Sequence, residues 1–355
     1  MQIKQVVMVD KRQVELQTVA LDEKVGADEF LVRTERTFIS AGTELANYTA
    51  KEPAVYQKGS WCAYPWRAGY ANVGVVEAVG TAVTRVAKGQ RVFTYGAHAS
   101  HVKCSQDAFV AAVPDGMDSG VAAASRMAGV ATSAMVLTDR SLHQPVVLVF
   151  GLGMVGNLAA QSFRILGAKV VGVDPLAARR RLAGRCGIAR LLPGGETADL
   201  KRGLKELVGV EQADICIDAS GLTPVVLQAL ALTADVGQLV LLGSPRAPFD
   251  GNLTAAFSAI HCRNIVVRGA LEYCFPAYPV TGIWGGRTPP LISLWEKQRL
   301  LFDWISDGRL VIEPLISHRL PPEKVRDAYE GLLAAPEEFM GVVLDWSVPG
   351  TRGGA

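Results

Sequence analysis

The feature that most constrains this chain is a glycine turn between an apolar segment and a helical one. Residues 146–156 read VVLVFGLGMVG, an apolar run that breaks into the spacing G-x-G-x-x-G. In this spacing the first glycine makes a tight turn, the second lets the backbone approach a pyrophosphate, and the third lets the helix pack against the strand. The sequence therefore predicts a dinucleotide site with the phosphates at the helix N-terminus. The predicted cofactor contacts in this turn are Gly151, Gly153, Met154, Val155 and Gly156.

An acidic residue follows at the distance expected of a ribose-binding group. A second strand-like run, residues 169–173, ends at Asp174, which follows Gly156 by 18 residues. A carboxylate there accepts hydrogen bonds from the ribose hydroxyls and repels a 2′-phosphate, so the sequence favours NAD over NADP. NADP is the alternative because three arginines come soon after, although we expect them on a solvated helix face: Arg179, Arg180 and Arg181.

Short apolar runs and helical stretches alternate from residue 146 to residue 271. The predicted strands are residues 146–150, 169–173, 214–218, 238–242 and 264–268, and the predicted helices lie near 154–166, 176–187, 199–208 and 223–232. This alternation is typical of an α/β fold with a parallel, doubly wound sheet.

The other segments have different patterns. Residues 1–115 hold short β-rich runs punctuated by Gly, Pro and Asn, which predicts a compact, barrel-like β domain. Residues 121–137 are small and apolar and suit a buried helix, whereas residues 275–290 are rich in Pro, Gly and aromatics and are predicted to be irregular. Residues 292–306 predict an amphipathic helix. A last helix carries an apolar stripe made by Val325, Ala328, Tyr329 and Leu332.

Composition excludes several classes of protein. A chain of 355 residues suggests about two domains, and with 49% hydrophobic and 20% charged residues it has enough apolar side chains for a sizeable core. The net charge of +2 gives no case for binding nucleic acid or an anionic membrane. The six cysteines form no C-x-x-C pair, and the chain has no uninterrupted run of 18 apolar residues. We therefore expect a soluble, cytoplasmic protein without disulfides.

Five stretches resemble segments of the medium-chain dehydrogenase/reductase superfamily, and the likeness covers nearly the whole chain. They are Ala41-Gly42-Thr43-Glu44-Leu45, residues 69–76 (GYANVGVV), 88–92 (KGQRV), 213–221 (ADICIDASG) and 240–243 (VLLG). Within the superfamily the chain resembles a branch with S-x-G-T-E or H-G-T-E in place of the cysteine motif. That branch includes bacterial sugar or glycoside 3-dehydrogenases and proteins of the hydroxyethyl-bacteriochlorophyllide dehydrogenase type.

The resemblance implies a specific architecture. A Rossmann doubly wound parallel sheet would be inserted in a β-rich, GroES-like barrel domain with a C-terminal helical return. The expected catalytic domain comprises residues 1–126 and 272–355, and the expected NAD-binding domain comprises residues 127–271. The resemblance also implies cofactor contacts at Ser220 and Gly243, and a homodimer or homotetramer through the sheet edge near residues 264–272.

The chain departs from the zinc-containing members of the superfamily at the metal ligands. Those members hold a catalytic zinc with a Cys, a His and a Cys or Glu, but the matching positions here are Ala41, Tyr70 and Arg126, none of which is an ordinary zinc ligand. The family's four-cysteine lobe is missing, and its proton-relay histidine falls on Ala46. We therefore predict an enzyme that uses no metal.

Without zinc, hydrogen-bond donors or a cation must stabilise the charge that develops on oxygen during hydride transfer. By the resemblance, Thr43 matches a hydroxyl that binds the substrate oxygen. Tyr70 is the candidate proton donor, and Arg126 could lower its pKa from the usual value of roughly 10 by favouring the phenolate. Glu44 matches an acid behind the site and could orient Tyr70 or pair with Arg126.

Other residues leave alternatives open. A repositioned metal site could use His98, His101 or Glu44, but histidines three apart in a strand point to opposite faces. Lys58 and the two histidines are also fallback acid/base candidates. Each proposed catalytic residue has a structural alternative as well: a turn hydroxyl, a packed aromatic ring or an ion pair.

An aromatic cluster before Tyr70 is the best indication of the substrate. Aromatic faces with interspersed donors suit a sugar ring, and the cluster comprises Tyr56, Trp61, Tyr64 and Trp66, with Lys58 and Arg67 among them. Tyr273, Tyr278 and Trp284 could close the same cleft or form a subunit interface. The leading hypothesis is NAD-dependent oxidation of a secondary hydroxyl of a sugar, glycoside or cyclitol. The alternatives are an NAD(P)H-dependent quinone or enoyl reductase and a catalytically silent dinucleotide-binding protein.

Overall fold

The computed structural model describes residues 1–139, 144–279 and 292–347. Trp284 lies outside the described residues. The chain divides into two compact units, which are described separately here. Unit 1 comprises Met1–Arg126, Phe275–Ser306 and Ile316–Ala355, and unit 2 comprises Met127–Cys274 and Asp307–Leu315.

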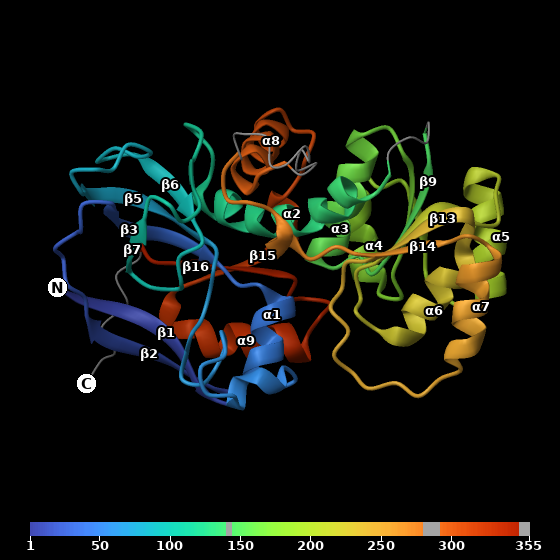
Figure 1. Cartoon of the computed structure of the whole chain (residues 1–355), viewed down its shortest axis with the longest axis horizontal. Helices are drawn as coiled ribbons and strands as arrows, with labels where there is room; N and C mark the ends of the chain where they lie inside the picture. Colours follow the sequence, from blue (N-terminus) through green and yellow to red (C-terminus); the bar gives the residue numbers. More distant parts are fainter. Residues whose placement is uncertain (140–143, 280–291, 348–355) are drawn as a thin grey trace, which may run out of the picture. The chain divides into compact units, whose positions relative to one another are not determined.

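Unit 2 is built on a sheet of six strands that are all parallel (Figure 1). The strands are β9 (Val146–Phe150), β10 (Lys169–Val173), β11 (Arg190–Leu192), β12 (Ala213–Asp218), β13 (Thr233–Leu241) and β14 (Val266–Gly269). Their order is β11-β10-β9-β12-β13-β14. The direction of winding therefore reverses between β9 and β12, which is where doubly wound sheets bind ligands. The predicted parallel, doubly wound sheet is confirmed.

Helices connect these strands. They are α3 (Met154–Ile165), α4 (Ala177–Arg185), α5 (Thr197–Val208), α6 (Thr223–Leu232) and α7 (Leu253–Cys262). Helix α3 packs against β9 and β10, α6 packs against β12 and β13, and α5, α6 and α7 are neighbours (Figure 1). The core between the layers contains Leu148, Val171, Leu204, Cys216 and Leu230. Burial of these apolar side chains is the main source of stability of the unit.

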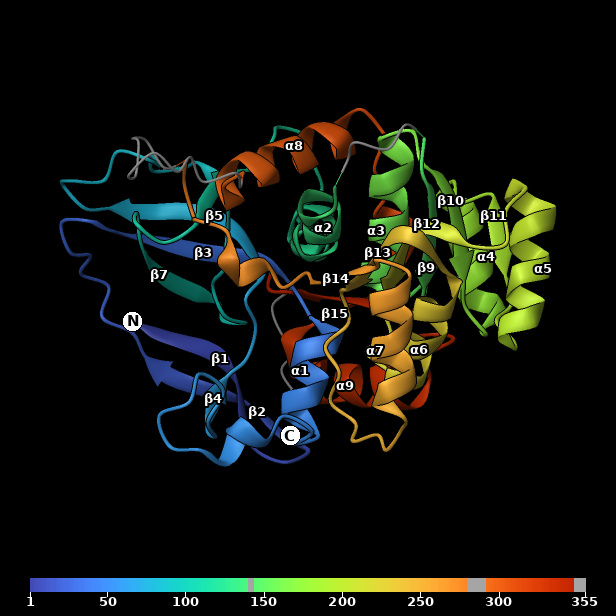
Figure 2. The same ribbon diagram turned by 45° about the vertical axis from the view of Figure 1, so that its right-hand side comes forward.

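The sheets of unit 1 are mostly antiparallel. Its strands are β1 (Gln2–Asp10), β2 (Gln13–Ala20), β3 (Glu29–Phe38), β4 (Trp66–Arg67), β5 (Asn72–Val79), β6 (Arg91–Thr94), β7 (His101–Ser105), β8 (Val110–Ala112), β15 (Ile316–Leu320) and β16 (Gly341–Asp345). A seven-stranded sheet has the order β15-β16-β3-β5-β6-β8, with β7 paired to β3, and a three-stranded sheet has the order β2-β1-β4 (Figure 2). Their inward side chains form apolar clusters, one of which contains Phe30, Val32, Val76 and Val92.

Four longer helices involve unit 1: α1 (Ala41–Tyr48), α2 (Ser119–Leu137), which continues into unit 2, α8 (Leu294–Ser306) and α9 (Val325–Ala334). The apolar stripe predicted for α9 is buried as expected, at Val325, Ala328, Tyr329 and Leu332. Single turns of 3-10 helix occur at Pro53–Tyr56, Glu272–Cys274, Glu313–Leu315 and Pro322–Lys324. Helix α1 was not predicted, because the sequence of residues 1–115 shows little helical periodicity.

One described helix, α2, is long and apolar enough to cross a membrane by length and composition. Its most apolar window is 83% buried inside the protein, which fits the buried core helix predicted for residues 121–137. The apolar character of α2 therefore reflects packing against the rest of the chain.

The close approach of α3 to the turn after β9 predicts different effects for two alanine substitutions. A Cβ at Gly156 would lie 1.8 Å from the Gly151 carbonyl oxygen, whereas a Cβ at Gly153 would meet no heavy atom within 4 Å. We expect Gly156→Ala to lower the free energy of unfolding by about 1–3 kcal/mol, because backbone must move. Gly153→Ala is the matched control and should change it by less than about 0.5 kcal/mol. Urea unfolding measures both, and equal destabilisation by the two variants would contradict the predicted contact.

Candidate active site

The glycine turn of unit 2 has the geometry of a phosphate cradle. Gly151 follows β9 with φ of +86°, a conformation that favours glycine. Gly153 is the N-cap of α3 and makes no side-chain cap, and the space beside its Cα is open. Backbone N–H groups at the start of α3, at Met154 and Val155, are therefore free of a capping side chain. An anion such as a pyrophosphate fits this helix N-terminus.

Asp174 lies at the carboxyl end of β10, beside the glycine turn, with only 1% of its surface exposed. One carboxylate oxygen accepts the backbone N–H of Leu152 at 2.8 Å, and the other accepts that of Leu176 at 2.8 Å. The residue therefore ties the turn after β9 to the turn after β10. Each carboxylate oxygen has a second lone pair, so the group can still accept a ribose hydroxyl.

We expected the three arginines after Asp174 to lie on a solvated helix face. For two of them, Arg179 and Arg180, that expectation was wrong. An Arg179 guanidinium nitrogen is 3.6 Å from the Asp174 carboxylate, with 29% of the Arg179 side chain exposed. Arg180 donates to the backbone carbonyls of Asp174 and Pro175 at 2.6 and 2.8 Å. The cation beside Asp174 offsets part of the repulsion that the carboxylate would exert on a 2′-phosphate.

Ser220 and Gly243 lie at the carboxyl ends of adjacent strands. The Ser220 hydroxyl donates to Asp218 at the end of β12 at 2.5 Å, and the backbone N–H of Gly243 donates to the carbonyl of the same Asp218 at 2.8 Å. A Cβ at Gly243 would lie 2.3 Å from the backbone nitrogen of Gly221. All the predicted cofactor contacts thus share the carboxyl edge of the sheet, on both sides of the switch point.

In unit 1, Tyr70 and Thr43 come together as the resemblance implies. The Tyr70 hydroxyl lies 3.2 Å from Thr43 Oγ1 and donates a short hydrogen bond to Ser40 Oγ. Ser40 precedes α1 and Thr43 is in its first turn, while Tyr70 comes just before β5. Since Ser40 does not cap the helix with its side chain, its hydroxyl is available to Tyr70. Three hydroxyl groups therefore converge at the start of α1.

Arg126 supplies positive charge next to these hydroxyls. Its guanidinium carbon lies 5.0 Å from the centre of the Tyr70 ring and 4.3 Å from the centre of the Tyr95 ring, over both faces. The Tyr95 ring stacks in turn on Phe109, with centroids 4.4 Å apart. The side chain at position 126 is thus held as a cation between two tyrosines rather than as a metal ligand.

The predicted effect of Arg126 on the Tyr70 pKa is confirmed in direction, but the predicted net lowering is not found. The Arg126 charge and the hydrogen bonds to Ser40 and Thr43 do lower the pKa of Tyr70, but burial of the phenol raises it more, and the Glu44 charge adds to the rise. The net pKa lies above the usual value of 10.0. Burial favours the uncharged form of a phenol. Tyr70 is therefore a neutral O–H donor at neutral pH.

The described residues show no contact by which Glu44 orients Tyr70 directly or pairs with Arg126. One carboxylate oxygen accepts the backbone N–H of Ser40 at 2.7 Å. The other accepts the Tyr329 hydroxyl at 2.6 Å and lies 3.0 Å from His98 Nε2. Glu44, His98 and Tyr329 are all fully buried. Glu44 thus fixes the turn that carries Ser40 and Thr43.

The His98 ring is confined by the backbone at Gly69. A Cβ at Gly69 would lie 2.6 Å from His98 Cγ, and Gly69 has φ of +95°. His101, the other histidine of this segment, lies 3.5 Å from Glu77, and burial lowers its pKa from 6.5. The two histidines therefore have different partners, but only His101 lies in a strand, β7, so the prediction from opposite strand faces does not apply to this pair.

The described residues do not fit a zinc ion. Ala41, Tyr70 and Arg126 occupy the positions that matched the family's ligands, and the residues that the structure describes contain no group of three or more His, Cys, Asp or Glu side chains able to hold a metal. Zinc in proteins takes three or four such ligands.

Part of the aromatic cluster, together with Lys58, lines another hollow of unit 1. Tyr56 and Tyr64 form one edge-to-face pair, and Trp61 and Trp66 form another. Tyr56, Lys58 and Tyr64 line a hollow of about 450 Å³ whose described lining does not include Tyr70. The cluster therefore gives no support to the predicted sugar platform. Tyr273 is 83% exposed in unit 2, and Tyr278 belongs to another pocket of unit 1.

Sequence reasoning missed Ser40, Tyr95 and Tyr329. Ser40 stands in the quoted S-x-G-T-E pattern, so its hydroxyl could have been noticed beside Thr43. Tyr95 and Tyr329 lie far from Tyr70 and Glu44 along the chain, and nothing in the sequence connects them. Only the fold brings these side chains to the site.

Comparison with known proteins agrees with this architecture. Residues 26–146 match the family described as alcohol dehydrogenase GroES-like domain, and residues 154–281 match the family described as zinc-binding dehydrogenase. The chain is 26% identical over 357 residues to an L-threonine 3-dehydrogenase from Coxiella burnetii, covering 91% of this chain and 93% of that protein. It is 28% identical over 329 residues to a D-guloside 3-dehydrogenase from Shigella flexneri, covering 85% and 89%.

The fold is shared with solved structures. An alcohol dehydrogenase from E. coli CFT073, complexed with the cofactor NADH, superposes with a TM-score of 0.77 at 18% identity, covering 97% of this chain and 99% of that one. Two family matches in the expected order, relatives that span most of the chain, and the Rossmann and GroES-like architecture agree. The chain therefore belongs to the medium-chain dehydrogenase/reductase superfamily and is an oxidoreductase of the alcohol dehydrogenase type with a nicotinamide cofactor.

Proposed function

We propose that this protein transfers hydride between NAD and a secondary alcohol without a metal ion, and that the alcohol is a hydroxyl of a sugar, glycoside or cyclitol. The observation that carries the proposal is the convergence of Tyr70, Thr43 and Ser40 beside the Arg126 cation. By the resemblance, Tyr70 and Arg126 stand at two of the positions where zinc-containing members of the superfamily have metal ligands. When bound, the nicotinamide ring accepts or supplies the hydride. The chain must then stabilise the substrate oxygen and move its proton.

The hydroxyl groups of unit 1 can do both. In carbonyl reduction, neutral Tyr70 would give its proton to the substrate oxygen, and Thr43 would donate a second hydrogen bond to that oxygen. In alcohol oxidation, the same phenol must first be deprotonated to accept the alcohol proton. Because burial raises the pKa of Tyr70, the tyrosinate is the minor form at neutral pH. Oxidation should therefore accelerate as pH rises, and reduction should not.

The choice of NAD over NADP rests on Asp174. Its buried carboxylate places negative charge at the end of β10, where the ribose is expected. Arg179 weakens this charge without removing it. The sugar assignment is supported by the guloside 3-dehydrogenase relative, and both curated relatives carry names that describe oxidation at carbon 3. A cytoplasmic location agrees with six free cysteines.

A homodimer through the edge of the unit 2 sheet is also part of this proposal. Strand β14 ends the sheet with its residues all exposed, and α7 buries none of its residues. Large apolar side chains are exposed along both elements, namely Leu253, Phe257, Val266 and Val267. An unpaired edge strand beside an apolar helix suits pairing with a second copy about a twofold axis.

The first test of the function is NADH formation from NAD by chelator-treated protein, over a panel of sugars, glycosides, cyclitols and simple secondary alcohols. We expect turnover on a polyhydroxylated ring together with less than stoichiometric zinc by elemental analysis. One zinc per chain that resists chelation, with activity that depends on it, would overturn the metal-free mechanism. Turnover only on quinones or enones with NADPH would favour a reductase.

Tyr70→Phe should reduce kcat by about 10²–10⁴-fold, because it removes the proton donor, while leaving the affinity for NAD nearly unchanged. In the wild-type protein kcat/KM for alcohol oxidation should rise with pH through the neutral range, and this rise should be absent in the variant. The matched control is Tyr48→Phe, which removes a hydroxyl bonded to Glu330 in the same unit. Full turnover in the Tyr70 variant would exclude that residue from the mechanism.

Substitutions at Asp174 and Arg179 should change cofactor preference in opposite directions. Asp174→Asn removes the charge that repels a 2′-phosphate, so the ratio of kcat/KM for NAD to that for NADP should fall by about tenfold, which equals about 1.4 kcal/mol. Arg179→Gln removes the neighbouring cation, so the same ratio should rise. A ratio that both variants leave unchanged would mean that the ribose lies elsewhere.

Sedimentation velocity tests the proposed dimer. We expect the wild-type protein to sediment as a dimer or larger oligomer at micromolar concentration, and Val267→Glu on β14 to sediment as a monomer, because it places charge on the apolar edge. The control is Val210→Glu, which replaces another exposed valine, after α5. A monomeric wild-type protein would contradict the proposal.

A further inference from the structure

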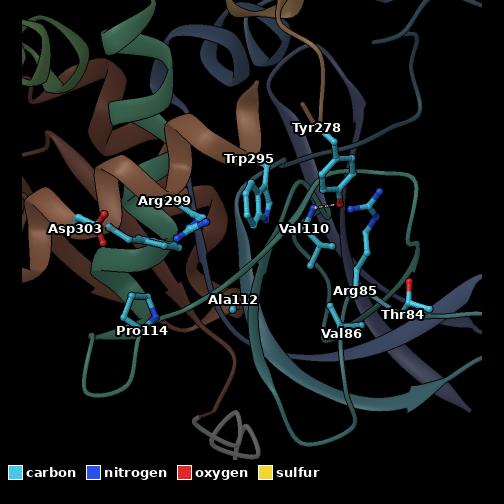
Figure 3. A pocket seen from close by; sticks show the side chains of 11 residues that line it. Thr84, Arg85, Val86, Val110, Ala112, Pro114, Tyr278, Trp295, Arg299 and Asp303 are labelled. Atoms are coloured by element: carbon cyan, nitrogen blue, oxygen red, sulfur yellow. Dashed lines mark hydrogen bonds between the residues drawn. The ribbon is translucent and has the colours of Figure 1, made fainter. Parts of the chain in front are cut away.

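Unit 1 contains a hollow that shares no residue with the candidate active site. Its volume is about 490 Å³, within the range of small-molecule sites. Its walls come from the turn before β6, from β8 and the residues that follow it, from Tyr278 and from α8. Figure 3 shows these segments around one opening.

Two arginines of this pocket are held by aromatic rings rather than by carboxylates. The Arg85 guanidinium carbon lies 3.7 Å from the centre of the Tyr278 ring, and that of Arg299 lies 4.8 Å from the centre of the Trp295 ring (Figure 3). Stacking leaves the N–H donors at the edge of a guanidinium available. Within residues 1–139, 144–279 and 292–347, neither arginine has a salt bridge or a hydrogen bond to a protein acceptor. Such donors suit a planar carboxylate.

Tyr278 is itself fixed in place. Its hydroxyl donates to the carbonyl of Ala108 at 2.8 Å and accepts the backbone N–H of Val110 at 3.2 Å. The ring that supports Arg85 is therefore anchored to the strand that forms the pocket wall. A preorganised cation loses less conformational entropy when it binds an anion than a free side chain does.

The remaining lining is apolar, with one exception. Val86, Val110 and Phe302 are buried beneath the opening, and the indole of Trp295 offers a flat face. Asp303, one turn after Arg299 on α8, is the only carboxylate among the described lining residues. The lining therefore carries two positive charges and one negative charge over an apolar floor. This combination recognises an anionic group attached to a flat, apolar ring.

We propose that this pocket is an accessory binding site for a small aromatic carboxylate, whose carboxylate pairs with an arginine of the lining, Arg85 or Arg299, and whose ring lies on the Trp295 and Phe302 side. The site is independent of the proposed dehydrogenase activity. A ligand there should bind whether or not a nicotinamide cofactor or an alcohol is present.

Isothermal titration of the full-length protein with benzoate tests the proposal. Benzoate supplies both the ring and the anion, inorganic phosphate supplies the anion alone, and phenol supplies the ring alone. We expect saturable binding of benzoate with one site per chain, and at least about tenfold weaker binding of phosphate and of phenol, because each lacks one of the two interactions. Absence of saturable benzoate binding would overturn the proposal, as would phosphate binding as tightly as benzoate.

Variants then assign the binding to this pocket. The double variant Arg85→Gln/Arg299→Gln should weaken benzoate binding by about tenfold or more, whereas Asp303→Asn should strengthen it by removing a repulsive charge. The control is Arg326→Gln, which removes an exposed arginine on α9 and should leave the affinity unchanged. Benzoate affinity that is the same in the double variant and in the wild type would exclude this pocket. Circular dichroism establishes that each variant is folded.

Discussion

The buried carboxylate of Glu44 holds together the part of unit 1 on which the candidate site depends. It accepts hydrogen bonds from the backbone of Ser40 and the hydroxyl of Tyr329, and it lies beside His98. Burying an ion costs several kcal/mol, and that cost is offset only when its lone pairs are satisfied. These partners come from the start of α1, the segment before β7 and α9, so that one group ties three segments to a single geometry. The contacts of Glu44 fix the positions of the Ser40 and Thr43 hydroxyls.

The proposed mechanism uses a different physical solution from that of zinc-containing dehydrogenases. A metal ion stabilises a developing oxyanion with a full charge at short range. In the proposed mechanism, hydroxyl donors stabilise the substrate oxygen, and Arg126 provides positive charge beside the rings of Tyr70 and Tyr95. The burial that raises the pKa of Tyr70 also strengthens each hydrogen bond, because the surroundings have a low dielectric constant.

Much of the fold could be predicted from the sequence because local patterns determine it. Strands β9 and β10 lie where continuous apolar runs predicted them, and the buried face of α9 is the stripe seen in the sequence. Helix α1 could not be predicted from its local sequence. It is stabilised by Glu44, which accepts the backbone N–H of Ser40, and by the distant residues His98 and Tyr329, which contact Glu44. Helix α7 was missed because it buries none of its residues and its sequence lacks a clear periodic pattern.

The residues of the candidate site could be predicted better than their pKa values and charge interactions. The resemblance brought Thr43, Tyr70 and Arg126 to one place, and the structure shows them there. The pKa of Tyr70 was misjudged because burial is a property of the whole fold and cannot be read from neighbouring residues. In the same way, the partners of Arg179 depend on how β10 and α4 meet, so the charge beside Asp174 was not foreseen.

Gly69 has a consequence for redesigning this protein. Its backbone conformation and the His98 ring against its Cα leave no room for a side chain one residue before Tyr70. A library that randomises position 69 would therefore consist mostly of misfolded clones, even though the residue touches no substrate in the proposed mechanism. A search for new specificity should keep Gly69 fixed as the support of Tyr70 and vary positions elsewhere.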